Sequence, residues 1–255
     1  MPDAEKKLLT WIDRHRFMLY VIILSVLGLL ARMGGLDFVS NDATEYLLVW
    51  FGQIRESGGL AALGSQVGNY NIPYQILISL MTYLPFEPLY MYKALSILFD
   101  YLLAGSAAGF CYDLTQKNTE RAVLVYGVVL LLPTVILNSS VWGQCDSIYV
   151  TFVICAVWSL MNERYTRSFL LLGAAFAFKL QAVFIFPFFL MYYILEKRFS
   201  ILNFVWVVVV DYALCIPAFL MGEEPSCPGE HLPVPVRAVL QHVFEISEFL
   251  GVGGR

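Results

Sequence analysis

The chain has 255 residues, of which 59% are hydrophobic and only 14% are charged. Soluble domains average about 45–50% apolar and about 25% charged residues, so this chain has too little charge to cover a soluble globule. The formal charge of −4, with Lys and Arg scattered along the chain, also argues against a nucleic-acid-binding protein, which needs a basic surface. Together with a mean hydropathy of +0.69, these numbers predict an all-α polytopic membrane protein.

Four apolar runs are long enough to cross a bilayer, which takes about 17–25 residues. They lie at residues 17–33, 89–110, 122–138 and 201–220. The first run follows basic residues and lacks a small-x-small cleavage site, so we expect an anchor and not a removed signal peptide. Asp100, inside the second run, is expected to face a partner helix.

Shorter apolar runs lie at residues 72–84, 147–161, 168–178 and 182–195. At about 1.5 Å per residue, an arm as short as 168–178 cannot cross about 30 Å of hydrocarbon. The stretch 168–195 therefore consists either of two short arms that meet near Lys179 or of one long tilted helix.

Most Lys and Arg residues fall into four groups, at 6–16, 117–121, 164–167 and 197–198. The positive-inside rule places all four groups, and thus the N-terminus, in the cytoplasm, provided that the run 72–84 does not cross. Three segments then lie on the outer face: a loop at about 34–88, a turn at 142–147, and a turn at Lys179.

The first outer loop carries acids and aromatic residues, among them Asp42, Glu45, Tyr70 and Tyr74. Its length exceeds what a mere connection requires, and long ordered loops tend to carry function. Asp42 could act as a general base on a hydroxyl group, or it could cap the segment 44–54 as a helix N-cap. The tyrosines could stack on sugar rings or belong to the interfacial aromatic belt.

The second outer segment ends the run Pro-Thr-Val-Ile-Leu-Asn-Ser-Ser-Val-Trp-Gly-Gln-Cys-Asp-Ser at 133–147. Trp142, Gln144 and Asp146 offer a stacking face, an amide and a carboxylate, which suit a polyhydroxylated ligand. Alternatively, Asp146 only caps the following helix.

The third outer segment contains Lys179 and Gln181, in the run Phe-Lys-Leu-Gln. A Lys within a membrane segment costs about 2.5–3.5 kcal/mol on insertion scales, which makes Lys179 a functional candidate. Its natural partner on the outer face is an anionic group such as a lipid phosphate, to which Gln181 could add a donor. The alternative is that Lys179 extends to the interface and binds nothing.

These motifs in this order resemble a known family. An early Asp in the first outer loop, Tyr-x-x-Pro-Tyr at 70–74, Trp-Gly-Gln-x-Asp-Ser at 142–147 and Phe-Lys-Leu-Gln at 178–181 are similar to bacterial relatives of the GPI-anchor mannosyltransferases. Those proteins belong to the glycosyltransferase-C (GT-C) superfamily, and the similarity extends over residues 10 to about 222. It implies a GT-C-like transmembrane helix bundle with a long first extracytoplasmic loop.

The resemblance further implies an integral membrane enzyme of the bacterial plasma membrane with an extracytoplasmic active site. It would move a hexose from a polyprenyl-phosphate donor to a glycan, lipid or protein acceptor by inverting displacement. By the same resemblance Asp42 is the catalytic acid/base, Asp146 a second active-site carboxylate, and Lys179 the contact to the carrier phosphate. The other candidate substrate-binding residues are Glu45, Tyr70, Tyr74, Trp142, Gln144 and Gln181.

No metal ligand is assigned. The cysteines form no Cys-x-x-Cys pair and no His stands at ligand spacing. The first loop holds the single Asp42 where some GT-C members have paired acids, so a divalent cation remains an open cofactor.

Members of this superfamily usually continue through several more helices, and the composition changes abruptly after residue 221. We therefore expect a cytoplasmic N-terminus (1–16), a GT-C-like transmembrane domain (17–221) and an atypical tail (222–255), non-native or disordered, in a truncated member. There are two alternatives to an active transferase. The first is a lipid or sugar transporter, because intramembrane charges and broken helices also mark transport sites. The second is an inactive relic.

Overall fold

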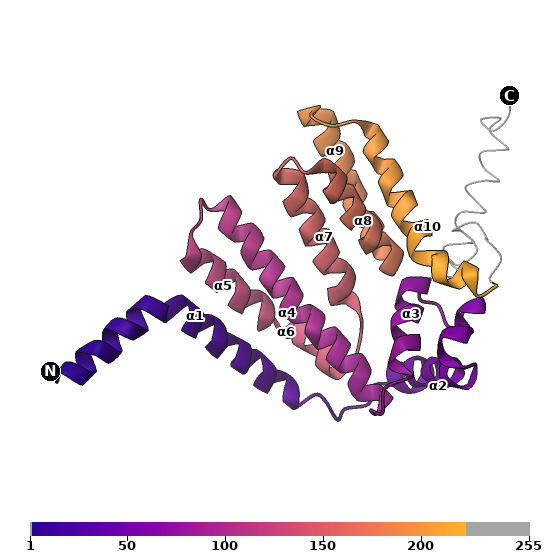
Figure 1. Cartoon of the computed structure of the whole chain (residues 1–255), viewed down its shortest axis with the longest axis horizontal. Helices are drawn as coiled ribbons and strands as arrows, with labels where there is room; N and C mark the ends of the chain where they lie inside the picture. Colours follow the sequence, from indigo (N-terminus) through magenta and orange to yellow (C-terminus); the bar gives the residue numbers. More distant parts are fainter. Residues whose placement is uncertain (1, 223–255) are drawn as a thin grey trace.

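The computed structural model describes residues 2–222, and every regular element in that range is helical (Figure 1). The α-helices are α1 (Asp3–Met33), α2 (Leu48–Glu56), α3 (Ile72–Met81), α4 (Pro88–Leu114), α5 (Thr119–Leu130), α6 (Pro133–Ile136), α7 (Asp146–Met161), α8 (Tyr165–Phe178), α9 (Phe186–Glu196) and α10 (Val205–Leu220). The prediction of an all-α chain is confirmed for this part. The expected tail, 222–255, lies outside the described residues except for Gly222.

Five short 3₁₀ or π segments complete the described chain. The 3₁₀ segments are η2 (Gly59–Gly64), η4 (Leu180–Ile185) and η5 (Ile201–Phe204), and the π segments are η1 (Ala43–Leu47) and η3 (Leu137–Val141).

The apolar runs predicted to span a membrane form helices of the required length. Helices α1 and α4, and the stretch Ile201–Leu220 formed by η5 and α10, are each long and apolar enough to cross a bilayer. The fourth run is bent by 48° between Thr119–Leu130 and Pro133–Val141, and it qualifies when both parts are taken together. Pro133 explains the bend, because proline has no N–H with which to continue the helical hydrogen bonds.

The stretch 168–195 is broken into two arms. Helix α8 ends at Phe178, Lys179 is extended with φ −153° and ψ 126°, and the chain continues through η4 into α9. The alternative of one long tilted helix is therefore wrong. Pro187 lies in the first turn of α9, where its missing N–H needs no partner, so it favours a new helix start after η4.

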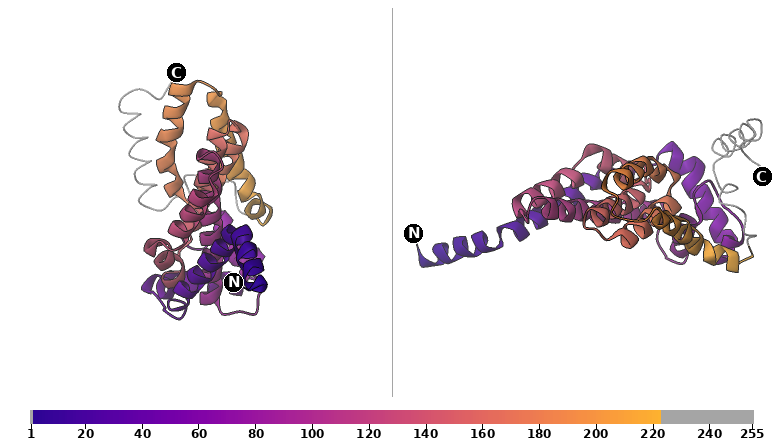
Figure 2. Two further views of the ribbon diagram at one scale, coloured as in Figure 1. Left: turned by 90° about the vertical axis from the view of Figure 1, so that its left-hand side faces the viewer. Right: turned by 90° about the horizontal axis from the view of Figure 1, so that it is seen from above.

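The helices lie side by side, with α7 packed against both α4 and α8, and α10 packed against α8. Figure 1 shows the loops α4–α5, α7–α8 and α9–α10 at one end of the bundle, the upper end in this view, whereas α2 and α3 lie at the other end. In Figure 2, the N-terminal part of α1 extends beyond the bundle. Three of the four basic groups thus share one end, and the assignment of that end to the cytoplasm stays a prediction.

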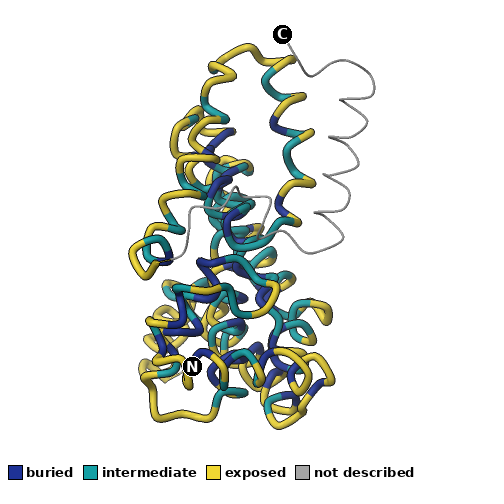
Figure 3. The backbone as a smooth tube through the Cα atoms, turned by 90° about the vertical axis from the view of Figure 1, so that its right-hand side faces the viewer, coloured by how far each residue is buried: buried dark blue, intermediate teal, exposed yellow. Residues whose placement is uncertain are grey.

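The surface of the helices is rich in large apolar side chains. Leu124, Leu195 and Leu202 are examples of strongly exposed residues on α5, α9 and η5. Figure 3 shows buried and partly buried positions interspersed with exposed ones along the helices of the bundle. Apolar outward faces on helices of spanning length are compatible with contact to lipid and with an integral membrane protein.

Small residues allow close helix packing, as at Gly173 in α8. A Cβ atom at this position would lie 2.9 Å from the Val210 side chain and 3.0 Å from the Val207 backbone of α10. Small residues serve this purpose in many membrane helix pairs. Gly173 therefore permits the contact between α8 and α10.

A buried ion pair connects four helices. Arg32 Nε of α1 donates to Asp100 Oδ2 of α4 at 2.9 Å, and both side chains are fully buried. The same guanidinium donates to the Leu130 carbonyl oxygen of α5 at 3.0 Å, and the Ser147 hydroxyl of α7 donates to Asp100. The expectation that Asp100 faces a partner helix is confirmed.

A second buried cation stabilises the chain directly after α1. Lys93 Nζ donates to the carbonyl oxygens of Gly35, Leu36 and Phe38 at 2.7, 2.8 and 2.6 Å. An ammonium group has three N–H donors, so this arrangement uses all of them. Lys93 thereby fixes the start of the first outer loop to α4.

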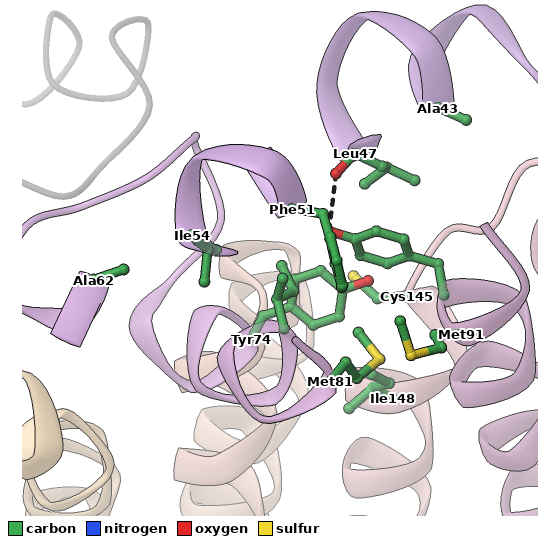
Figure 4. Close-up of a cluster of buried hydrophobic side chains, with 12 residues drawn as sticks. Ala43, Leu47, Phe51, Ile54, Ala62, Tyr74, Met81, Met91, Cys145 and Ile148 are labelled. Atoms are coloured by element: carbon green, nitrogen blue, oxygen red, sulfur yellow. Dashed lines mark hydrogen bonds between the residues drawn. The ribbon is translucent and has the colours of Figure 1, made fainter. Parts of the chain in front are cut away.

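Most of the first outer loop is helical and packs on the end of the bundle. Figure 4 shows the apolar cluster that joins it to the bundle, with Leu47 and Phe51 from the loop beside Met91, Cys145 and Ile148 from the bundle. The Tyr92 hydroxyl donates to the Leu47 carbonyl oxygen at 3.0 Å. This cluster holds the loop against the N-terminal end of α7.

Candidate functional site

Side chains from the first outer loop and the 142–147 turn are hydrogen-bonded to each other. Tyr70 Oη donates to Gln144 Oε1 at 2.7 Å, and Gln144 Nε2 donates to Asp42 Oδ2 at 3.2 Å. Gln144 therefore links two residues of the first loop that lie on either side of α2.

The third outer segment joins the same group of residues. Lys179 Nζ donates to Asp146 Oδ1, and Asn138 Nδ2 donates to Asp146 Oδ2 at 2.8 Å. The Lys179 ammonium also lies 5.8 Å from the centre of the Tyr70 ring, within the range of a cation–π contact. Its side chain is only 16% exposed, so this charge is largely shielded from water.

The helix-capping alternatives for both aspartates are wrong. Asp42 immediately precedes η1, but its side chain caps no backbone N–H, and the Ser40 hydroxyl accepts from the Ala43 N–H at 3.1 Å in its place. Asp146 begins α7, and its carboxylate binds Asn138 and Lys179. The alternative of an unpartnered Lys179 is wrong for the same reason.

Two π-helical segments flank the site. Asp42 directly precedes η1 and Asn138 lies within η3. π-Helical turns are rare and occur frequently at functional sites. The sequence analysis assigned no role to Asn138, although it lies in the polar run 133–147, because nothing in that run indicates which side chain turns toward Asp146.

A cavity of about 240 Å³ lies beside Lys179. The polar side chains that line it are Asn69, Tyr70, Asn71, Lys179 and Gln181. A cavity of this size holds several water molecules, each of which takes about 30 Å³ in the liquid. The cavity therefore offers a polar group room next to the ammonium, with amide groups on its wall.

Burial determines the protonation of two groups in the site. It raises the pKa of the Tyr70 hydroxyl well above its usual value, and the neighbouring acidic groups act in the same direction. It also raises the pKa of the Cys145 thiol to about 11. Tyr70 therefore remains a neutral donor to Gln144, and Cys145 remains a thiol at neutral pH.

The other predicted site residues are placed differently. Tyr74 has no exposed surface and belongs to the apolar cluster of Figure 4. Trp142 is 45% exposed and Glu45 is also exposed, and within residues 2–222 neither makes a hydrogen bond to the residues of the site. Gln181 is exposed at the cavity. The structure thus brings together Asp42, Tyr70, Gln144, Asp146 and Lys179.

The turn that presents Gln144 has a backbone conformation at position 143 that favours glycine. The φ of Gly143 is +67°, a region that residues with a Cβ atom rarely adopt. We expect Gly143→Ala to lower the free energy of unfolding by about 1–2 kcal/mol, because the neighbours leave room for a methyl group and the backbone strain remains. Thermal unfolding of the detergent-purified protein measures this loss.

The matched control is Gly105→Ala in α4, where nothing lies within 4 Å of the added methyl group. Alanine stabilises a helix interior by about 0.5–1 kcal/mol relative to glycine, so this variant should be as stable as the parent or more so. Equal destabilisation by both substitutions would contradict a special role for Gly143.

Comparison of the chain with models of known protein families, with curated protein sequences and with solved structures finds no match. Within residues 2–222, no group of three or more His, Cys, Asp or Glu side chains is placed to hold a metal ion. The functional proposal therefore rests on the sequence resemblance described above and on the geometry of the site's own residues.

Proposed function

We propose that this chain is a membrane glycosyltransferase of the GT-C type that transfers a hexose from a polyprenyl-phosphate donor to a hydroxyl acceptor. The observation that supports this proposal is the approach of two hydrogen-bonded groups from segments far apart in sequence. Asp42 is linked through Gln144 to Tyr70, and Lys179 is bound to Asp146. The Lys179 ammonium lies 5.8 Å from the centre of the Tyr70 ring, and both residues line the polar cavity. Glycosyl transfer needs these two opposite charges, one to accept a proton and one to stabilise a leaving phosphate.

In the proposed reaction, the acceptor oxygen attacks the anomeric carbon from the face opposite the phosphate. The bond between the anomeric carbon and the phosphate oxygen breaks, and its electron pair stays on the phosphate. The acceptor proton passes to the Asp42 carboxylate, and the Lys179 ammonium stabilises the charge that develops on the phosphate. A fixed cation in a partly dry site is more effective than one in water, because its field is less screened.

We assign Asp146 the role of a positioning residue. Its carboxylate accepts from both Asn138 and Lys179, so it orients the ammonium. Lys179 has three N–H donors, and the bond to Asp146 uses one of them. The other two remain for a phosphate group in the adjoining cavity.

The alternative function is transport of a lipid or a sugar across the membrane. The break between α8 and α9 supports it, because interrupted helices form the substrate sites of many transporters. A transporter would move the labelled compound across the membrane of a vesicle without changing it, whereas a transferase would form a new glycosidic bond.

The test of the proposed function is sugar transfer in membranes that carry the 255-residue chain. The substrates are radiolabelled polyprenyl-phosphate hexoses, and the readout is label in glycan, lipid or protein after the donor has been extracted. We expect donor-dependent transfer in these membranes and none in membranes without the chain. Counterflow of unmodified label, with no transfer, would refute the transferase and favour the transporter.

Lys179→Gln is expected to lower the rate of transfer by about 10²–10³-fold, because glutamine cannot offset the charge of the leaving phosphate. The effect should fall on kcat more than on KM, since the phosphate gains charge in the transition state. Lys197→Gln, at an exposed Lys on the other end of the bundle, is the control and should keep parental activity. Parental kcat in the Lys179 variant would exclude this role.

A further inference from the structure

A second polar cleft lies where α7 turns into α8, at the end of the bundle opposite the candidate site (Figure 1). Its volume is about 90 Å³, which corresponds to about three water molecules. Asp113 near the end of α4 forms one wall, and the α7–α8 turn contributes Ser159, Arg164 and Arg167. None of these residues belongs to the proposed transfer site.

The charges around this cleft do not balance. Asp113 is paired with Lys117, and it also accepts from the Trp158 indole N–H at 2.8 Å. Within the described residues, Arg164 and Arg167 make no ion pair. The cleft therefore has an excess of positive charge carried by two guanidinium groups.

Two further features of the cleft favour an anion. Ser159 lines it and is only 6% exposed, and within residues 2–222 its hydroxyl donates no hydrogen bond. Helix α8 begins here without a side-chain cap, and the first N–H bond at this end runs from Ser168 to the Arg164 carbonyl. Uncapped N–H groups and the positive end of the helix dipole both favour a bound anion.

We propose that this cleft binds a phosphate group, as the headgroup of an anionic phospholipid or as free phosphate. Arg164 and Arg167 supply planar donors that match phosphate oxygens, and Ser159 supplies a hydroxyl donor from a largely buried residue. The basic loops place this end of the bundle on the predicted cytoplasmic side, where anionic lipids attract basic residues. The proposal does not depend on sugar transfer at the other end.

The experiment is native mass spectrometry of the detergent-purified full chain, titrated separately with phosphatidylglycerol, phosphatidylcholine and inorganic phosphate. We expect one phosphatidylglycerol to bind more tightly than phosphatidylcholine, and Arg164→Gln/Arg167→Gln to weaken that binding at least about tenfold. Arg198→Gln is the matched control, because Arg198 is an exposed arginine at the same end that is already paired with Glu163 at 2.6 Å. It should bind as the parent does.

Competition by inorganic phosphate distinguishes the two sources of the group. Phosphate that binds alone and displaces the lipid shows that the cleft recognises the free anion, whereas lipid binding that phosphate does not displace shows a headgroup site. Ser159→Ala provides a second variant that leaves both charges in place, and it should weaken binding severalfold. The proposal is refuted if neither ligand binds, or if the double variant binds as tightly as Arg198→Gln.

Discussion

Asp42→Asn is expected to abolish sugar transfer while the protein remains folded. Asparagine has nearly the same shape, and its side-chain oxygen can still accept from Gln144, so the hydrogen-bonded group should persist. It cannot take a proton from the acceptor hydroxyl, and general-base catalysis contributes about 10²–10⁴-fold. Initial rates of radiolabelled transfer at equal protein content measure the effect.

Asp37→Asn is the matched control for this substitution. Asp37 lies in the same outer loop, and its carboxylate accepts from the Tyr90 hydroxyl at 2.7 Å outside the candidate site. Asparagine at this position can still accept from Tyr90, and loss of one surface charge outside the site should leave transfer within about twofold of the parent. Equal activity of the two variants would remove Asp42 from the role of base.

Arg32→Met is expected to destabilise the protein by about 3–5 kcal/mol, which is the usual effect of leaving one partner of a buried ion pair alone. Asp100 would lose its charged partner in a region without exposed surface, and the Leu130 carbonyl oxygen would lose a donor. Thermal unfolding in detergent, followed by the loss of helical circular dichroism, measures the shift. Asp100→Leu should have an effect of similar size.

The double variant Arg32→Met/Asp100→Leu tests whether the two losses share one cause. Replacing both partners of a buried pair with apolar residues is often neutral, so the double variant should be more stable than either single variant. If instead the two losses simply add, the ion pair does not couple α1 to α4.

The four spanning runs could be predicted because their signal is local. Each is a continuous apolar stretch. The polar interruption at Lys179, where helix α8 ends, is also visible in the local sequence. The positions of the basic loops also predict three segments on one face, and the structure places residues of all three in contact. The side of the membrane on which they lie stays a prediction. These features depend on composition and on the dimensions of a bilayer.

The contacts inside the site could not be predicted, because they join residues that are distant in sequence. Tyr70 and Gln144 are separated by 74 positions, and nothing in either motif indicates the other. Tyr70 and Tyr74 were both predicted to bind substrate, although only the packing of α3 decides which of the two rings is buried. The π-helical turns η1 and η3 could not be predicted either, because such turns are rare and no residue pattern in these segments indicates them.

Lys93 links the segment directly after α1 to a helix that is synthesised later. Its ammonium binds the carbonyl oxygen of Gly35, which precedes it by 58 positions, together with those of Leu36 and Phe38. When α1 has been synthesised and inserted, these three carbonyl groups still have no ammonium partner, because the ribosome has not yet made α4. The start of the first outer loop is therefore fixed only after the chain has been made through Lys93 of α4, and the contacts of this loop with Gln144 form later still.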